Sequence, residues 1–159
     1  MTDRPRAHVI AALEGTILRS PVGGTTILKA RAETTGGWFT LLENLVPPHQ
    51  GPPLHVHGNE DEMWYVLDGN FRFRADEEIL HASTGSFVFV PRGTRHCFQN
   101  IGDAPARILV MFTPSGMEAF FEAHAALPPG PVDPETYRLI AAAVGMSVAG
   151  PPLAVSDPI

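Results

Sequence analysis

The segment from residue 25 to residue 113 reads as one short strand after another, and this pattern restricts the fold more than any other feature. Its apolar runs have strand length and are rich in β-branched and aromatic side chains, and the short sequences GG, DGN, DEE, STG, PRG and GDAP separate them. Glycine, proline, asparagine and aspartate favour turns. About eight strands at this spacing predict an all-β fold, a small antiparallel β-barrel or sandwich.

One of these turns has the composition of a β-hairpin. In VLDGNFRF, residues 66–73, Asp68 and Gly69 stand between two alternating apolar runs. Both residue types tolerate the positive φ angles of a tight turn. We therefore predict that the strands on either side of Gly69 pair with each other.

After Pro114 the pattern becomes helical. Ser115 and Glu118 have the spacing of a capping box, followed by Phe120 and Phe121 on one apolar stripe. A second helix is predicted from Asp133 as N-cap to Gly145 as terminator. We expect both helices to pack on the outside of the sheet and the proline-rich tail, residues 151–159, to be irregular.

The bulk composition bounds the class of protein. The chain has 159 residues, 44% of them hydrophobic and 18% charged, which predicts one globular domain with a barrel core at about 25–113 and a helical extension at about 114–159. The net charge of −6 disfavours nucleic acid or an anionic membrane as partner. The apolar patch near residue 10 is too short for a signal peptide, and no run has the roughly 20 apolar residues of a membrane span. We expect a cytoplasmic protein with a small-molecule substrate, and a homodimer is the candidate assembly.

Two histidines in the stretch LHVHGNEDEMWYVLDG suggest a metal site. Residues two apart in a strand face the same side, so His55 and His57 project together. Glu62 follows after a short turn and lies on the next predicted strand. Two imidazoles and a carboxylate suit a transition metal, although exposed histidines at the start of a strand are also common.

A second stretch, GSFVFVPRGTRHCFQN, strengthens the metal interpretation. Gly85, Pro91, Gly93, His96 and Asn100 form a five-point spacing that is rarely produced by chance. His96 begins a strand directly after a turn, as His55 does. It is therefore the candidate fourth ligand.

The two stretches resemble the two conserved motifs of the cupin superfamily. Motif one corresponds to His55, His57, Glu62 and Gly69, and motif two matches at every fixed position. One departure is that His49 stands where motif one begins with glycine, although Gly51 is nearby. The resemblance implies a cupin fold, that is, a double-stranded β-helix or jelly roll, with one divalent transition metal (Fe, Ni, Mn, Co, Cu or Zn) held by the three histidines and Glu62.

The chain is similar in ligand set, size and C-terminal helix to single-domain cupins of the quercetin 2,3-dioxygenase type. This resemblance implies a dioxygenase acting on a small enolic or phenolic, flavonol-like substrate, with Glu62 as proton acceptor. A metal-dependent lyase, isomerase or cyclase that works without oxygen is the alternative, and a non-catalytic small-molecule binder is a third. Proteins with this fold catalyse many different reactions, so all three functional interpretations remain open.

Three further residues are candidates for the pocket wall. Trp64 shares the face of Glu62, Phe98 lies two residues after His96, and His49 is close to the turn before His55. For Trp64 and Phe98, an ordinary place in the core is an equal alternative. Cys97 should face away from His96 as a small core residue, and His124 is expected at the surface.

Overall fold

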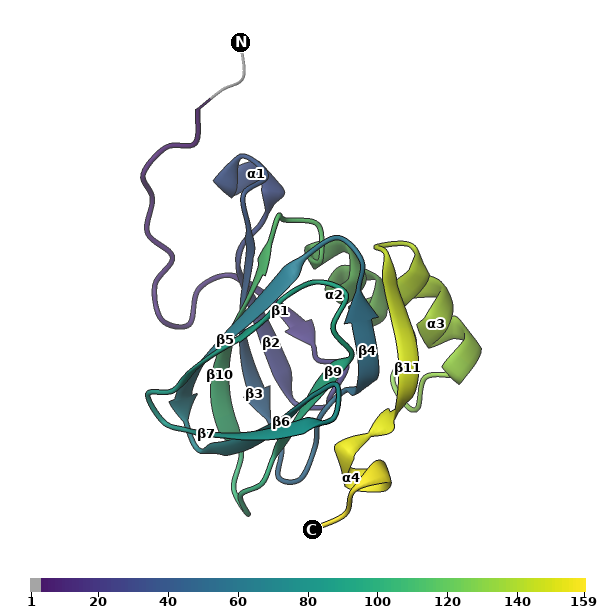
Figure 1. Cartoon of the computed structure of the whole chain (residues 1–159). Helices are drawn as coiled ribbons and strands as arrows, with labels where there is room; N and C mark the ends of the chain where they lie inside the picture. Colours follow the sequence, from purple (N-terminus) through teal and green to yellow (C-terminus); the bar gives the residue numbers. More distant parts are fainter. Residues whose placement is uncertain (1–3) are drawn as a thin grey trace.

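The computed structural model describes residues 4–159 and contains two antiparallel sheets that face each other, with the two longer helices along one side (Figure 1). The first sheet has the order β1-β2-β3-β10-β5-β8. Its strands are β1 (Thr16–Arg19), β2 (Thr25–Ala30), β3 (Thr40–Val46), β10 (Ala106–Thr113), β5 (Asp61–Asp68) and β8 (Phe87–Val90). The second sheet has the order β11-β4-β9-β6-β7. Its strands are β11 (Met146–Pro152), β4 (Pro53–His57), β9 (His96–Asn100), β6 (Asn70–Ala75) and β7 (Glu78–Ser83).

The predicted all-β class is confirmed, but the described strands do not close into the predicted barrel. Over residues 4–159 the strands form two separate hydrogen-bonded sheets that are not joined into one continuous barrel. Apolar side chains from both inner faces, among them Leu42, Trp64, Phe73 and Ile108, are almost completely buried between them. The arrangement is therefore a β-sandwich of the jelly-roll kind.

The predicted hairpin at Gly69 is wrong. Strand β5 pairs with β10 and β8 in the first sheet, whereas β6 pairs with β9 and β7 in the second. Gly69 has a φ of 102°, and a Cβ atom there would lie 2.5 Å from that of Ala106. Gly69 does form a turn with a positive φ angle, as predicted, but this turn carries the chain from one sheet to the other.

The two predicted helices exist as α2 (Glu118–Ala125) and α3 (Pro134–Ala142). They do not lie on the outside of a sheet, because Phe120 and Phe121 of α2 are buried in the core that the two sheets share. Asp133 caps α3 as predicted, accepting a hydrogen bond from the Thr136 amide at 3.0 Å. The helices close one side of the sandwich (Figure 1).

The predicted capping box at Ser115 is wrong, since the N-cap of α2 is Met117. The Glu118 carboxylate instead accepts hydrogen bonds from the Gly116 amide at 2.8 Å, the Ala32 amide at 2.8 Å and the Thr40 hydroxyl. Ala32 begins the short helix α1 (Ala32–Thr35) and Thr40 begins β3. Glu118 therefore ties three chain segments together.

The C-terminal extension is not purely helical. Strand β11 pairs with β4 through the partners Met146 with His57 and Val148 with His55. On its other side, β4 meets β9 at a single pair, His55 with His96. The predicted irregular tail thus contains the end of β11 and the short helix α4 (Leu153–Ser156).

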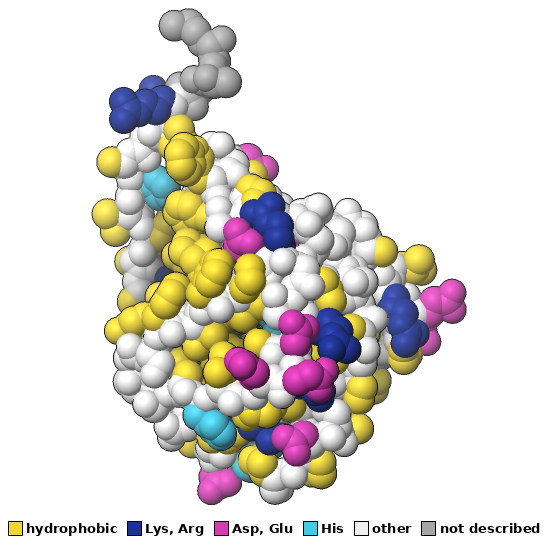
Figure 2. Space-filling view, in the orientation of Figure 1, with side chains coloured by type: hydrophobic (Ala, Val, Ile, Leu, Met, Phe, Trp, Pro, Cys, Tyr) yellow, Lys and Arg dark blue, Asp and Glu magenta, His cyan; other side chains and the backbone are white. Residues whose placement is uncertain are grey.

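Several large hydrophobic side chains are exposed at the surface. Figure 2 shows hydrophobic side chains gathered beside the N-terminal arm. On the outer face of the first sheet, Tyr65, Phe87 and Phe89 are all exposed. Among the helices of residues 4–159, none has the length and apolar character to cross a membrane.

Candidate metal centre

The fold brings together the four side chains predicted as ligands. His55 and His57 come from β4, Glu62 from β5 and His96 from β9, and all four are buried. One ligating atom from each lies within 4.8 Å of those from the other three. Metal–ligand bonds of about 2.0–2.2 Å require donors within roughly 4.4 Å of one another. Small side-chain rotations therefore suffice to bring these donors around one ion.

One oxygen is the centre of the cluster. Oε2 of Glu62 lies 2.7 Å from Nε2 of His96, 3.0 Å from Nε2 of His57 and 3.8 Å from Nε2 of His55. The pair with His96 has hydrogen-bond geometry. Three imidazoles thus present the same ring nitrogen to one carboxylate.

The opposite ring nitrogens fix two of the three imidazoles. Nδ1 of His55 lies 2.8 Å from the Pro53 carbonyl oxygen, and Nδ1 of His96 lies 2.9 Å from that of Thr94. A carbonyl oxygen only accepts, so each Nδ1 must carry the proton. In the neutral ring this leaves the Nε2 lone pair available to a metal, as is usual for ligating histidine. His96, whose Nε2 also donates to the Glu62 carboxylate, must first lose its Nε2 proton.

His57 differs from the other two histidines. Neither of its ring nitrogens makes a hydrogen bond within residues 4–159, although the side chain is 1% exposed. A buried polar atom without a partner costs about 1–3 kcal/mol. An ion at Nε2 would remove half of this deficit, and this observation supports a metal as the missing group.

Burial and mutual proximity shift the pKa values of the cluster in different directions. Burial opposes ionisation of Glu62, yet the imidazoles around it hold its pKa well below the ordinary value. Burial, together with the nearby His96, lowers the pKa of His55 to about 4. Burial also acts to lower the pKa of His96, but the Glu62 carboxylate outweighs it and the pKa is raised. The cluster thus keeps an anionic oxygen and a neutral His55 at neutral pH.

The remaining members of the second sequence motif hold the strands that carry the ligands. The Gly93 amide donates to the His57 carbonyl oxygen at 2.9 Å, and Gly93 has a φ of 84°, which favours glycine. Asn100 donates through Nδ2 to the carbonyl oxygens of Val46, Pro47 and Ala104 and accepts from the Gly102 amide. These residues are structural supports of the site.

A mostly apolar cavity opens onto the cluster. His55, His57 and Glu62 form part of its wall, and aromatic side chains from two strands and two helices form much of the rest. The apolar wall contains Phe98, Val110, Phe112, Met117, Phe120, Phe121 and Met146. The polar side chains there that are not candidate ligands are Ser20, Asn44 and Tyr137. The wall suits an apolar ligand that carries a few oxygen atoms.

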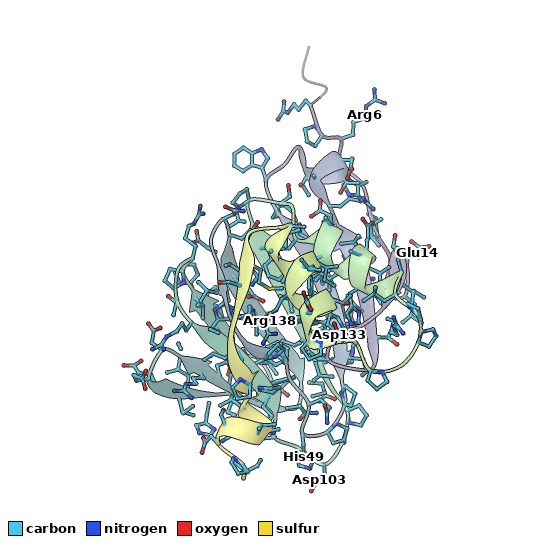
Figure 3. All side chains as sticks on the ribbon, turned by 90° about the vertical axis from the view of Figure 1, so that its right-hand side faces the viewer. Arg6, Glu14, His49, Asp103, Asp133 and Arg138 are labelled. Carbon is cyan, nitrogen blue, oxygen red and sulfur yellow. The ribbon has the colours of Figure 1, made fainter. Side chains whose placement is uncertain are left out.

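The predicted pocket residues have different positions. Phe98 lines the cavity, as one of the two interpretations expected. Trp64 packs in the core between Phe73 and His96, with ring centroids 5.2 and 5.6 Å away. His49 lies at the surface, 3.3 Å from Asp103, and Figure 3 shows this pair at the end of the molecule below α4. Its place before His55 in the sequence did not bring it to the cavity.

Several cavity residues were not predicted from sequence. Met117, Phe120, Phe121 and Tyr137 belong to the segment that was expected outside the sheet. The apolar stripe on α2 was the available signal, but a stripe does not say which surface it covers. His124, expected at the surface, is buried beside Tyr137. Cys97 is buried as predicted, and burial raises the pKa of its thiol to about 11.

Comparison with known proteins agrees with this architecture. Residues 43–112 match the family described as Cupin domain. The uncharacterized protein MJ1618 of Methanocaldococcus jannaschii is 33% identical over 70 residues, covering 44% of this chain and 56% of that protein. The tetracenomycin polyketide synthase protein TcmJ of Streptomyces glaucescens is 27% identical over 95 residues, covering 58% of this chain and 62% of TcmJ. These matches span about three-fifths of each relative.

A solved structure with the same fold is that of an RmlC-like cupin from Shewanella frigidimarina. It superposes with a TM-score of 0.59 at 15% identity, covering 70% of this chain and 96% of that one. The fold is therefore a cupin fold, and the domain match together with this structure supports the cupin superfamily. This support stops at the superfamily, so the likeness to quercetin 2,3-dioxygenase stays a prediction.

Proposed function

With the cupin fold and its His₃Glu cluster as premise, we propose that this protein is a metal-dependent enzyme and that it acts as a dioxygenase on a small enolic or phenolic substrate. His55, His57, Glu62 and His96 hold one divalent transition metal. The observation that carries the proposal is the convergence of three Nε2 atoms on one Glu62 oxygen at the end of an apolar cavity.

The chain's own residues supply binding, exclusion of water and a proton acceptor. When bound, a divalent metal acts as a Lewis acid that acidifies a hydroxyl at an open coordination position. Phe98, Phe112 and Phe121 hold the flat part of the substrate and keep water from the reacting group. The Glu62 carboxylate accepts the hydroxyl proton, because it is the anionic group in the cavity wall.

Similarity to a polyketide synthase protein bears on the substrate class. Polyketide chains carry carbonyl groups on alternate carbons, and such groups enolise readily. The match to TcmJ therefore favours an enolic or phenolic substrate derived from a polyketide. The same match favours the second candidate, a lyase, isomerase or cyclase that uses enolate stabilisation without oxygen.

The decisive experiment separates these candidates. The metal content of freshly purified protein is measured first, and flavonols, catechols and β-diketones are then screened in an oxygen electrode. Oxygen uptake that depends on the metal supports the dioxygenase. Metal-dependent substrate loss under argon supports the lyase, isomerase or cyclase. Tight ligand binding without turnover in either atmosphere leaves a binding protein and contradicts both enzymes.

A further inference from the structure

The three candidate histidine ligands are not held in the same way. His55 and His96 each place Nδ1 against the carbonyl oxygen of the residue two positions earlier in the chain. Those acceptors are neutral and belong to the backbone of the ligand's own segment. His57 has no such acceptor within residues 4–159, and its Nδ1 is buried without a hydrogen bond.

The group that faces Nδ1 of His57 is a carboxylate. Oε2 of Glu60 lies 3.7 Å from this nitrogen, and this oxygen is also buried without a hydrogen-bond partner among the described residues. The Glu60 side chain is 4% exposed, which is uncommon for a glutamate. Two unpartnered polar atoms of complementary type therefore face each other just beyond hydrogen-bond distance.

The turn that carries Glu60 is fixed on both sides. The Gly58 amide donates to the Gly145 carbonyl oxygen at 3.0 Å, and Asn59 donates to that of Val144 at 3.2 Å. After Glu60, Asp61 points outward and accepts from the Arg92 amide at 2.9 Å. The turn therefore directs the Glu60 carboxylate inward and the Asp61 carboxylate outward.

We propose that Glu60 is the positioning residue of His57, with its Oε2 accepting the Nδ1 proton and thereby fixing Nε2 as the metal-donating atom. The inference rests on the proposed metal site. An anionic acceptor makes the imidazole a stronger donor than a backbone carbonyl does. His57 is then the most strongly donating of the three histidines.

Glu60 is not a fifth ligand in this arrangement. Its carboxylate lies on the Nδ1 side of His57, whereas the ion would bind on the Nε2 side, where Glu62 Oε2 lies 3.0 Å away. Its effect on the ion passes through the imidazole ring. A change at Glu60 should therefore resemble the loss of an outer partner, about 10–100-fold in metal affinity.

The test uses Zn²⁺ as probe and compares two neighbouring carboxylates in the full chain. Glu60→Gln keeps the shape and removes the charge, and we expect Zn²⁺ affinity to fall by about 10–100-fold. Asp61→Asn removes the same charge one residue away but leaves His57 untouched, so its affinity should equal that of the wild type. Equal losses in both variants, or no loss in Glu60→Gln, would overturn the proposal.

A second readout does not need the metal. The ¹⁵N chemical shifts of His57 report which ring nitrogen carries the proton, and we expect the Nδ1–H form in the wild type and a shift toward Nε2–H in Glu60→Gln. Unchanged shifts would overturn the proposal. If the wild type binds no Zn²⁺, the proposed metal site is contradicted. The chemical shifts still show whether Glu60 accepts the Nδ1 proton of His57. Glu60→Asp, which withdraws the carboxylate by one methylene, serves if Glu60→Gln does not fold.

Discussion

Nε2 of His96 lies 2.7 Å from Oε2 of Glu62, although 34 residues separate them in the chain. His96 stands on β9 in the five-stranded sheet and Glu62 on β5 in the six-stranded sheet. Their contact therefore crosses the interior and links the two layers of the sandwich at the cluster. A change at either residue alters both the site and the junction between the sheets.

His96→Ala should weaken Zn²⁺ binding by more than about 100-fold, because removal of a ligand exceeds the 10–100-fold effect of losing an outer partner. Competition with a chelator of known affinity measures this loss. His81→Ala, which alters an exposed histidine on β7, is the matched control and should bind as the wild type does. Retention of wild-type affinity in His96→Ala would mean that His96 is not a ligand.

Glu62→Gln should separate the role of ligand from that of proton acceptor. The amide keeps an oxygen for the metal but cannot take a proton at neutral pH. We expect turnover per bound metal to fall by roughly 10²–10⁴-fold, the usual contribution of a general base. Activity divided by metal content, with whichever substrate the screen finds, measures this. Turnover per metal near that of the wild type would leave Glu62 as a ligand alone.

Metal loading should depend on pH through His96. Its pKa is raised by Glu62, so the ring is protonated below that value and must lose a proton to ligate. His55, with a pKa of about 4, is already neutral over the same range. Zn²⁺ affinity should therefore fall as pH decreases through the raised pKa of His96, starting above the ordinary histidine value of about 6.5. Calorimetry in buffers of different ionisation enthalpy counts the released proton, and an affinity that stays constant between about pH 8 and pH 5 would contradict this.

Glu118→Gln should destabilise the fold by about 1–3 kcal/mol, because the side chain then loses its charge-assisted hydrogen bonds. Burial opposes ionisation of Glu118, but hydrogen bonds from Thr40 and two amides keep its pKa below the ordinary value. This stabilisation is complete above the unfolded pKa and is lost as pH falls through the lower, folded pKa. Urea unfolding at neutral and acidic pH should show the wild type and the variant converging in acid.

The matched control for that measurement is Glu122→Gln. Glu122 lies on the same helix and pairs with Arg31 at 2.6 Å, but both side chains are about one-third exposed or more. Exposed pairs contribute about 0–1 kcal/mol. A loss as large as that of Glu118→Gln would show that the charge of α2, and not the buried contacts of Glu118, sets the stability.

Local pattern was sufficient to predict most strands and the ligand cluster. A strand alternates its side chains, so His55 and His57 had to share a face, and the turn before His96 placed it at the start of a strand. The spacing of glycine and proline around them restricted the loops. These are short-range constraints, and they survive folding because the buried faces must match.

The sequence alone does not show which distant segments pair or pack together. The turn at Gly69 has the same local chemistry whether its strands pair together or enter different sheets, so the crossover was missed. The stripe of Phe120 and Phe121 identified a buried helix face without naming the cavity that it covers. Glu60 and Asp61 are adjacent carboxylates, and only the folded structure of the turn that carries them shows that Glu60 points inward.

The pairing of β11 with β4 has a consequence for how the site is made in the cell. The strand that carries His55 and His57 meets β9 at one residue pair, and the strand that pairs along most of its length is Met146–Pro152. Synthesis must therefore continue through Pro152 before β4 can acquire that neighbour. Residues 43–112, the part that matches the cupin family, carry all four candidate ligands but not this strand. A fragment confined to residues 43–112 would therefore keep the four candidate ligands but leave this edge of β4 without its partner strand.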